Sequence, residues 1–318
     1  MEGEREAQSR TVGARRPTPE EQLMAPTSVP SDTAILRPGP RLTTAWVLSS
    51  VVLVLMATSS AVGLLVEGIY PEETWAVAAL RGNDLVTLVL VVPVLALALA
   101  ASRLRPSSAS VLVWLGMLLY GLYNFAYYSF GAAFNDLFLL HVAAYSLSGI
   151  AMALLGTSID ADVAARGVVG GVRAKVVAAF TLGVGIALLG AWGAMSVRVS
   201  RTGELPQEVM PPEAVHLVYA IDMGILAPMF VIAGVLLWRA APWGAVMGVA
   251  VNASGAAYLM VLEVVGGFQA DAGIPGASWL SPVAIGAVLA CLLATLALLV
   301  RPHPSRTVAR GRPAPARA

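Results

Sequence analysis

Charged residues are scarce in this chain. They make up 12% of its 318 residues, whereas soluble domains contain about 25%. Hydrophobic residues make up 58%, and apolar runs of about 20 residues recur along the chain, as expected of membrane-spanning helices. The composition therefore excludes an ordinary soluble domain and predicts an all-α, polytopic membrane helix bundle.

Cysteine and histidine are almost absent as well. The single Cys291 lies in an apolar run, so an internal disulfide is excluded. With three histidines in all and no zinc-type Cys/His spacing, we expect neither a metal nor a cofactor. The chain also lacks a phosphate-binding glycine loop, a His-Glu-x-x-His motif and a Gly-x-Ser-x-Gly elbow. Its net charge of +1 argues against a nucleic-acid partner and leaves the lipid bilayer as the expected one.

About eight segments are long enough to cross roughly 30 Å of hydrocarbon at about 1.5 Å per residue. They cover roughly residues 44–66, 84–102, 109–130, 134–156, 174–196, 214–238, 242–264 and 281–300. The predicted organisation is an N-terminal tail over 1–43, a transmembrane domain over 44–301 and a C-terminal tail over 302–318. Both tails lack a sustained apolar period and are rich in polar residues and proline, so we expect them to be disordered.

Basic residues fall mostly on one side of this alternating arrangement. On that side they are Arg5, Arg10, Arg15, Arg16, Arg37, Arg41, Arg103, Arg105, Arg166, Arg173, Lys175, Arg239, Arg301, Arg306, Arg310, Arg312 and Arg317. The opposite loops contain only Arg81, Arg198 and Arg201. The positive-inside rule then predicts that both termini are cytoplasmic. Because arginine, alanine and valine abound as in GC-rich bacterial genes, we expect a bacterial plasma (inner) membrane.

The two halves of the domain share an order of landmarks. Asp84, Pro93, Arg103, Trp114, Asn124 and Tyr128 in the first half correspond to Asp222, Pro228, Arg239, Trp243, Asn252 and Tyr258 in the second. Four spans per half would give a parallel 4+4 repeat. Chance similarity among apolar helices is the alternative, because the spacings differ by several residues.

Polar side chains concentrate between Tyr120 and His141, within predicted membrane-spanning sequence. Polar groups in hydrocarbon need partners. Tyr120, Tyr123, Asn124, Tyr127 and Tyr128 follow the spacing of one helix face. Two interpretations remain open, since tyrosines near a helix end also form interfacial belts, and an intramembrane asparagine such as Asn124 also joins helices.

Asp222 is the most specific signal, because an acid well inside a span is costly and by default functional. A structural, hydrogen-bonded acid is the alternative. Tyr219 lies on the same face, His141 lies about two turns into the fourth span, and Asn252 lies in the seventh. His141 and Asn252 also fit purely structural roles. The predicted ligand-binding residues are Tyr120, Tyr123, Asn124, Tyr127, His141, Tyr219, Asp222 and Asn252.

These residues predict a binding or transport protein whose polar pocket opens outward and takes a small or amphipathic ligand. One alternative is an integral membrane enzyme acting on a lipid or isoprenoid, with Asp222 and His141 as acid and base about 3–8 Å apart. Another is a non-catalytic scaffold or sensor. The sequence leaves the ligand, the energy coupling, the oligomeric state and enzymatic activity undetermined.

Overall fold

The computed structural model describes residues 34–168, 170–204 and 212–300. Within these ranges the chain is an all-α bundle, with eight helices long and apolar enough to cross a membrane. These spans are α2 (Pro40–Leu65), α3–η1–α4 (Thr74–Val86, Thr87–Val91, Val92–Leu104), α5 (Ser108–Gly131), α6 (Phe138–Ser158), α8 (Gly171–Thr202), α9–η2–α10 (Pro212–Ile221, Asp222–Leu226, Ala227–Trp238), α11 (Pro242–Asp271) and α12 (Pro282–Leu299). The predicted fold class and span count are confirmed. The protein is a multi-pass membrane protein.

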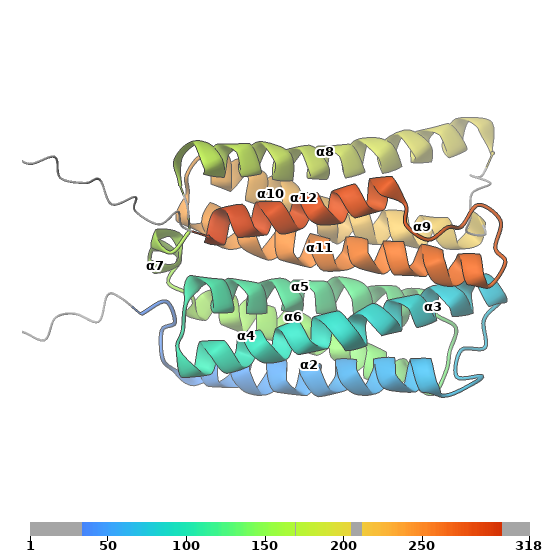
Figure 1. Ribbon diagram of the computed structural model, residues 1–318, viewed down its shortest axis with the longest axis horizontal. Coiled ribbons are helices and arrows are strands. Elements are labelled where there is room, and N and C mark those ends of the chain that lie inside the picture. The colour runs from blue at the N-terminus through green and yellow to red at the C-terminus, as the bar shows by residue number, and fades with distance from the viewer. Residues whose placement is uncertain (1–33, 169, 205–211, 301–318) are drawn as a thin grey trace, which may run out of the picture. The chain divides into compact units, whose positions relative to one another are not determined.

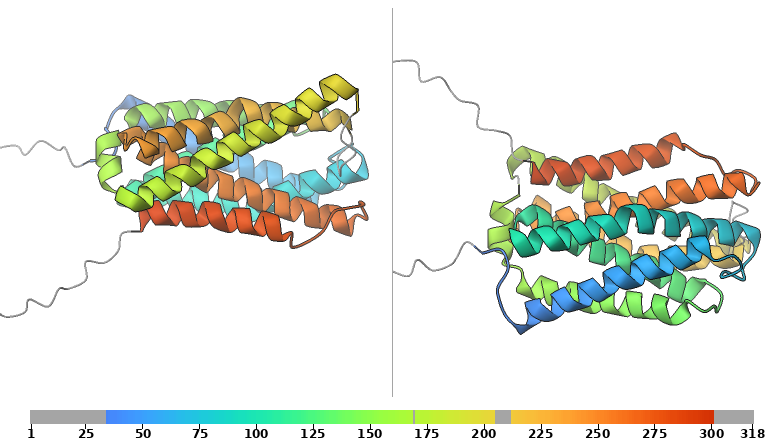
Figure 2. Two further views of the ribbon diagram at one scale, coloured as in Figure 1. Left: turned by 90° about the horizontal axis from the view of Figure 1, so that it is seen from above. Right: turned by 60° about the horizontal axis from the view of Figure 1, so that its bottom comes forward.

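Successive spans run in opposite directions, so the two ends of the described chain lie at one end of the bundle (Figures 1 and 2). The opposite end, which we call the distal end, contains the loops 66–73, 132–137 and 272–281. A short helix, α7 (Ala161–Arg166), lies in the connection at the near end. The assignment of the near end to the cytoplasm stays a prediction.

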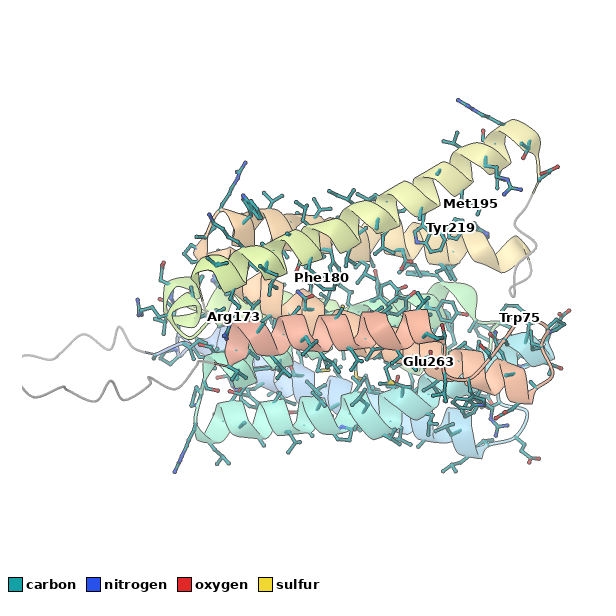
Figure 3. The ribbon with its side chains drawn as sticks, turned by 45° about the horizontal axis from the view of Figure 1, so that its top comes forward. Trp75, Arg173, Phe180, Met195, Tyr219 and Glu263 are labelled. Atoms are coloured by element: carbon teal, nitrogen blue, oxygen red, sulfur yellow. The ribbon has the colours of Figure 1, made fainter. Side chains whose placement is uncertain are left out.

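Helices α5 and α11 form the centre of the bundle. Their most apolar stretches are 83% and 67% buried, against 22–44% for the other spans. The two backbones approach closely because Gly116 has no side chain: a Cβ there would lie 2.8 Å from the Ala250 carbonyl oxygen. Helices α3, α6, α10 and α12 pack on this centre, whereas α2 packs mainly on α6 and α8 mainly on α10. Phe180 of α8 lies against the buried core (Figure 3). The outer helices expose apolar side chains such as Leu97 and Val283. Those side chains suit contact with lipid.

The second span begins ten residues earlier than predicted, at Thr74 instead of residue 84. Arg81 and Asn83 were predicted to lie in the loop before this span and Asp84 at its first residue, but each finds a partner inside the bundle. Arg81 donates to the carbonyl oxygen of Leu64 in the last turn of α2, at 2.8 Å. That helix end leaves carbonyl groups without intrahelical partners, so a cation is favoured there.

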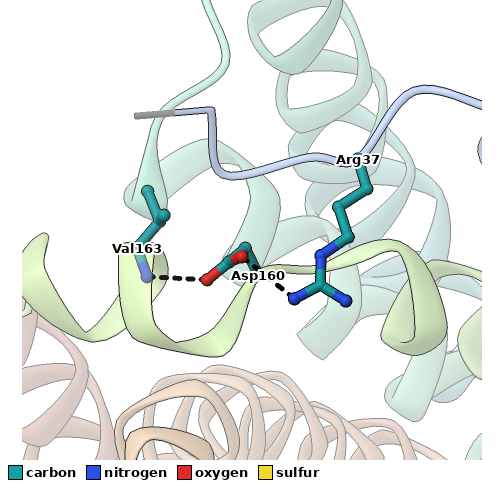
Figure 4. A network of polar contacts seen from close by, with 3 residues as sticks. All are labelled: Arg37, Asp160 and Val163. Atoms are coloured by element: carbon teal, nitrogen blue, oxygen red, sulfur yellow. Dashed lines mark hydrogen bonds and ion pairs between the residues drawn. The ribbon is translucent and has the colours of Figure 1, made fainter. Parts of the chain in front are cut away.

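Helix α2 also begins before its predicted start, at Pro40, and the residues ahead of it are ordered from Ala34. Ile35 and Leu36 are buried, and the Arg37 guanidinium lies 3.0 Å from the Asp160 carboxylate (Figure 4). Residues 34–43, which were predicted to belong to the disordered tail over 1–43, are therefore part of the folded bundle. The rest of that tail, and the predicted tail over 302–318, lie outside the described residues.

A π-helical turn interrupts the second and the sixth span, and each turn precedes a proline. Residues 87–91 precede Pro93 and residues 222–226 precede Pro228. A proline inside a regular helix clashes with the carbonyl of the fourth residue before it, and a wider turn relieves that clash. The two π turns, and the prolines after them, are 135 residues apart. At this offset Tyr258 pairs with Tyr123 instead of the predicted Tyr128, and Asp222 pairs with Thr87 instead of the predicted Asp84. The shared offset favours a 4+4 repeat with this different pairing, and the repeat remains a prediction.

Candidate functional site

A cavity of about 390 Å³ lies in the distal half of the bundle. Helices α3, α5, α9 and α11 and the loop before α12 surround it. Its polar lining includes Asn83, Tyr123, Asn124, Tyr127, Tyr258 and Glu263. Gly276 and Ser278 also border it and are exposed, so the cavity reaches the distal surface. Its volume falls within the range of small-molecule sites.

Two lining residues, Asn83 and Asn124, belong to a chain of buried polar groups that continues behind the cavity wall. The Asn83 amide Nδ2 donates to Asn124 Oδ1 at 2.8 Å. Thr87 Oγ1 lies 3.3 Å from Asn83 Oδ1, to which it donates, and 2.7 Å from the Tyr120 hydroxyl. In this arrangement Asn83 is the donor and Asn124 Oδ1 the acceptor. The Asn124 Nδ2 group is left without a partner among the described residues, although Asn124 is 1% exposed.

Asp222 lies behind the cavity wall. Its carboxylate accepts hydrogen bonds from the Tyr123 hydroxyl at 2.6 Å and from Trp192 Nε1 at 2.8 Å. Tyr123 contacts Tyr258 edge-on, with ring centroids 4.7 Å apart. Both tyrosines line the cavity whereas Asp222 does not. In this structure the acid therefore positions a pocket wall.

Tyr219 lies in α9, the first segment of the sixth span, next to Trp192. Its ring stacks on Trp192 with centroids 4.2 Å apart, and Figure 3 shows it beneath α8. Tyr219 is not among the cavity-lining residues. It supports the indole that donates to Asp222.

A second buried carboxylate, Asp84, lies in a cluster of its own. One oxygen accepts from the Tyr70 hydroxyl at 2.7 Å and the other from the Tyr128 hydroxyl at 2.9 Å. Burial, with the Asp84 carboxyl beside it, raises the pKa of Tyr70, so this phenol remains a donor. Asp84 is 1% exposed and does not line the cavity.

His141 belongs to the Asp84 side of the bundle. Its ring lies 4.6 Å from that of Tyr128 and 6.0 Å from that of Phe125. Tyr128 is five residues from Tyr123, which points it about 140° away around α5. His141 and Asp222 thus contact different faces of this helix, and the acid–base pair expected of a lipid-modifying enzyme is not assembled here.

The polar stripe of the third span divides between these surroundings. Tyr120, Asn124 and Tyr128 bond to groups on α3 and η1. Tyr123, Asn124 and Tyr127 line the cavity, so Asn124 belongs to both surroundings. Asn252 lies elsewhere: its Nδ2 donates to Thr181 Oγ1 at 2.9 Å and to the Gly248 carbonyl at 2.7 Å. It joins α11 to α8, which matches the structural interpretation.

The predicted ligand-binding residues omit six polar residues of the lining: Asn83, Tyr258, Glu263, Gln269, Ser278 and Ser281. Asn83 precedes the second span as predicted from residue 84, and Glu263 falls at the end of the seventh span as predicted to residue 264. In fact α11 continues to Asp271, so Glu263 lies eight residues, or about 12 Å, inside it. A longer estimate of this helix would have marked Glu263 as an intramembrane acid.

Comparisons with protein-family models, curated proteins and solved structures found no match for this chain. In the part of the chain that the structure describes, no three His, Cys, Asp or Glu side chains gather closely enough to hold a metal ion. The cavity and its lining are therefore the basis for assigning a function.

Proposed function

We propose that this protein binds a small amphipathic solute in the distal cavity and transports it across a bacterial plasma membrane. With the near end in the cytoplasm, as the distribution of basic residues predicts, the cavity opens outward. The observation on which the proposal rests is the unpartnered Asn124 Nδ2 in the cavity wall. A buried amide donor without an acceptor costs about 1–3 kcal/mol, and a solute that supplies the acceptor removes that cost.

The apolar part of the lining supports an amphipathic solute. Val218, Val261, Leu262 and Val265 border the cavity together with the tyrosine rings. Such a site binds the apolar body of a ligand by burial and orients it through a few polar groups.

Transport is supported by the way in which α5 contacts both π turns. Tyr120 contacts Thr87 at the start of η1, and Tyr123 contacts Asp222 at the start of η2. The two π turns lack regular α-helical hydrogen bonding and adjoin prolines, which makes them suitable hinges. A solute that touches Tyr123 and Asn124 would therefore act on groups bonded to both hinges.

Thermal unfolding of the purified protein in nanodiscs, with a panel of small amphipathic solutes, tests binding. A stabilising solute would then be followed by counterflow into proteoliposomes. In Asn124→Leu, the solute concentration needed for a given rise in melting temperature should increase at least tenfold. Asn252→Leu is the matched control, since it removes an equally buried amide outside the cavity and should lower stability without changing solute affinity. Equal losses of affinity in the two variants would contradict the proposed site.

A further inference from the structure

Glu263 has one carboxylate oxygen in use and one free. Oε1 accepts the backbone N–H of Ser281 at 2.9 Å, which ties α11 to the start of α12 (Figure 3). Oε2 has no hydrogen-bond partner within residues 34–168, 170–204 and 212–300. The residue is only 8% exposed and lines the cavity. A buried carboxylate oxygen without a partner is costly, so a donor or cation is expected beside it.

The rest of the lining contains no counter-charge for this acid. Among the described residues around the cavity there is no lysine, arginine or histidine, and Glu263 is the only carboxylate. Gln269, a further neutral group of the lining, already donates to the Trp75 carbonyl oxygen at 3.3 Å. The positive charge that would balance Glu263 must therefore come from the occupant.

Three aromatic rings add to the same preference. Tyr123, Tyr127 and Tyr258 all line the cavity, and an ammonium group is attracted to the face of such rings within about 6 Å. Anionic occupants gain nothing from these rings and are repelled by the carboxylate. Neutral occupants gain only the apolar contacts.

We propose that the cavity selects organic cations: a protonated amine bound by Glu263 Oε2, on a short apolar body that also offers an acceptor to Asn124 Nδ2. This inference rests on the proposed function and specifies the chemical class of its solute. Selectivity arises because an ammonium group supplies the donors that the carboxylate lacks, while the tyrosine rings favour its charge.

Three probes with one skeleton and the same ether oxygen as acceptor test the inference: 3-phenoxypropylamine, 3-phenoxypropanol and 3-phenoxypropionate. Their binding to the full chain in nanodiscs at neutral pH is measured by calorimetry and by thermal stabilisation. We expect the amine to bind at least tenfold more tightly than the alcohol, and the carboxylate to bind least. Glu263→Gln should remove the preference for the amine and leave the alcohol unchanged, because the glutamine Oε1 still accepts from Ser281.

Glu67→Gln provides the control for general electrostatics. Glu67 is exposed at the distal end and lies outside the cavity lining, so this variant should keep the preference. Binding of the alcohol or the carboxylate as tightly as the amine would overturn the cation inference while leaving a solute site in place. Binding of none of the three, with no response from any member of the solute panel, would overturn the proposed function itself.

Discussion

Asp84 and Asp222 are buried to the same extent, 1% exposed each, and each accepts two hydrogen bonds from aromatic side chains. Each also lies ten residues, or about 15 Å, from the distal start of its helix. They differ in what their partners touch. The partners of Asp84 face other protein groups, whereas Tyr123, a partner of Asp222, lines the cavity. Burial of an acid therefore does not identify a ligand site, and the contacts of its partners do.

The largest expected effect on stability comes from removing the carboxylate of Asp84, which does not line the cavity. Asp84→Leu leaves the buried Tyr70 hydroxyl without its acceptor, at about 1–3 kcal/mol. Tyr128 loses one hydrogen bond, worth about 1 kcal/mol, but keeps the Leu80 carbonyl oxygen at 3.1 Å as an acceptor. We expect a loss of about 2–4 kcal/mol in the free energy of unfolding, with solute affinity in the surviving folded protein unchanged. Denaturant titration followed by tryptophan fluorescence measures it. Unfolding at the wild-type denaturant concentration would show that the cluster adds nothing to stability.

Gly63 probes how tightly the Asp84 cluster is packed. A Cβ at Gly63 would meet Asp84 Oδ2 and the Tyr70 hydroxyl, so Gly63→Ala should cost about 1–3 kcal/mol through overpacking. The cost should shrink in the Asp84→Ala background, because the smaller side chain makes room, and a double-mutant cycle would detect this coupling.

Gly190→Ala is the control for the change of residue type alone. Nothing lies within 4 Å of a Cβ built there, and the position is exposed within α8. Replacing a helical glycine with alanine should stabilise the protein by about 0.5–1 kcal/mol. A destabilised Gly190→Ala would mean that the effect at Gly63 cannot be assigned to the carboxylate.

Asp222→Asn compared with Asp84→Asn tests the contrast between the two acids directly. The asparagine at 222 keeps an oxygen for Tyr123 but presents an amide to Trp192, so the wall of the cavity is held less firmly. We expect solute affinity to fall a few-fold in Asp222→Asn and to stay at the wild-type value in Asp84→Asn. Isothermal calorimetry with the best solute of the panel measures both, and identical affinities would remove the coupling assigned to Asp222.

The smallest effect is expected at Asp160, a partly exposed acid that serves as a reference for the buried pair. Its hydrogen bond from the Val163 backbone N–H and then that from Arg37 hold the pKa of its carboxyl below the ordinary value of about 3.9. A depressed folded-state pKa stabilises the protein above the unfolded-state pKa, and this stabilisation disappears as the pH falls through the folded-state pKa. Asp160→Asn should therefore lower the melting temperature only slightly at neutral pH and not at all well below pH 3.9; a pH series of melting curves checks both limits.

Hydrophobic runs were sufficient to predict the eight spans, because lipid exposure selects the same residue types along each helix. Span ends were harder to predict wherever a polar side chain is satisfied by a neighbouring helix, as at Arg81, Asn83 and Asp84. One helix alone carries no signal that such a partner exists.

The candidate site was predictable only in part for a related reason. Periodicity placed Tyr123, Asn124 and Tyr127 on one stripe, and all three line the cavity. Asp222, His141 and Asn252 were assigned to the same site because they lie at intramembrane positions of their spans. Such a position does not determine which neighbouring helix a side chain contacts. Glu263 was missed because its position depends on where α11 ends.

The π turns set the angular register of the two helices that contain them. A π turn holds one residue more than an α-helical turn, and one residue corresponds to about 100° of rotation. Deleting one residue from 222–226 would convert the sixth span to a regular helix and swing Asp222 about a quarter of a turn relative to α10. The direction in which the Asp222 carboxylate points thus depends on the number of residues in the π turn. An insertion or deletion there would redirect the carboxylate even though Asp222 itself is unchanged.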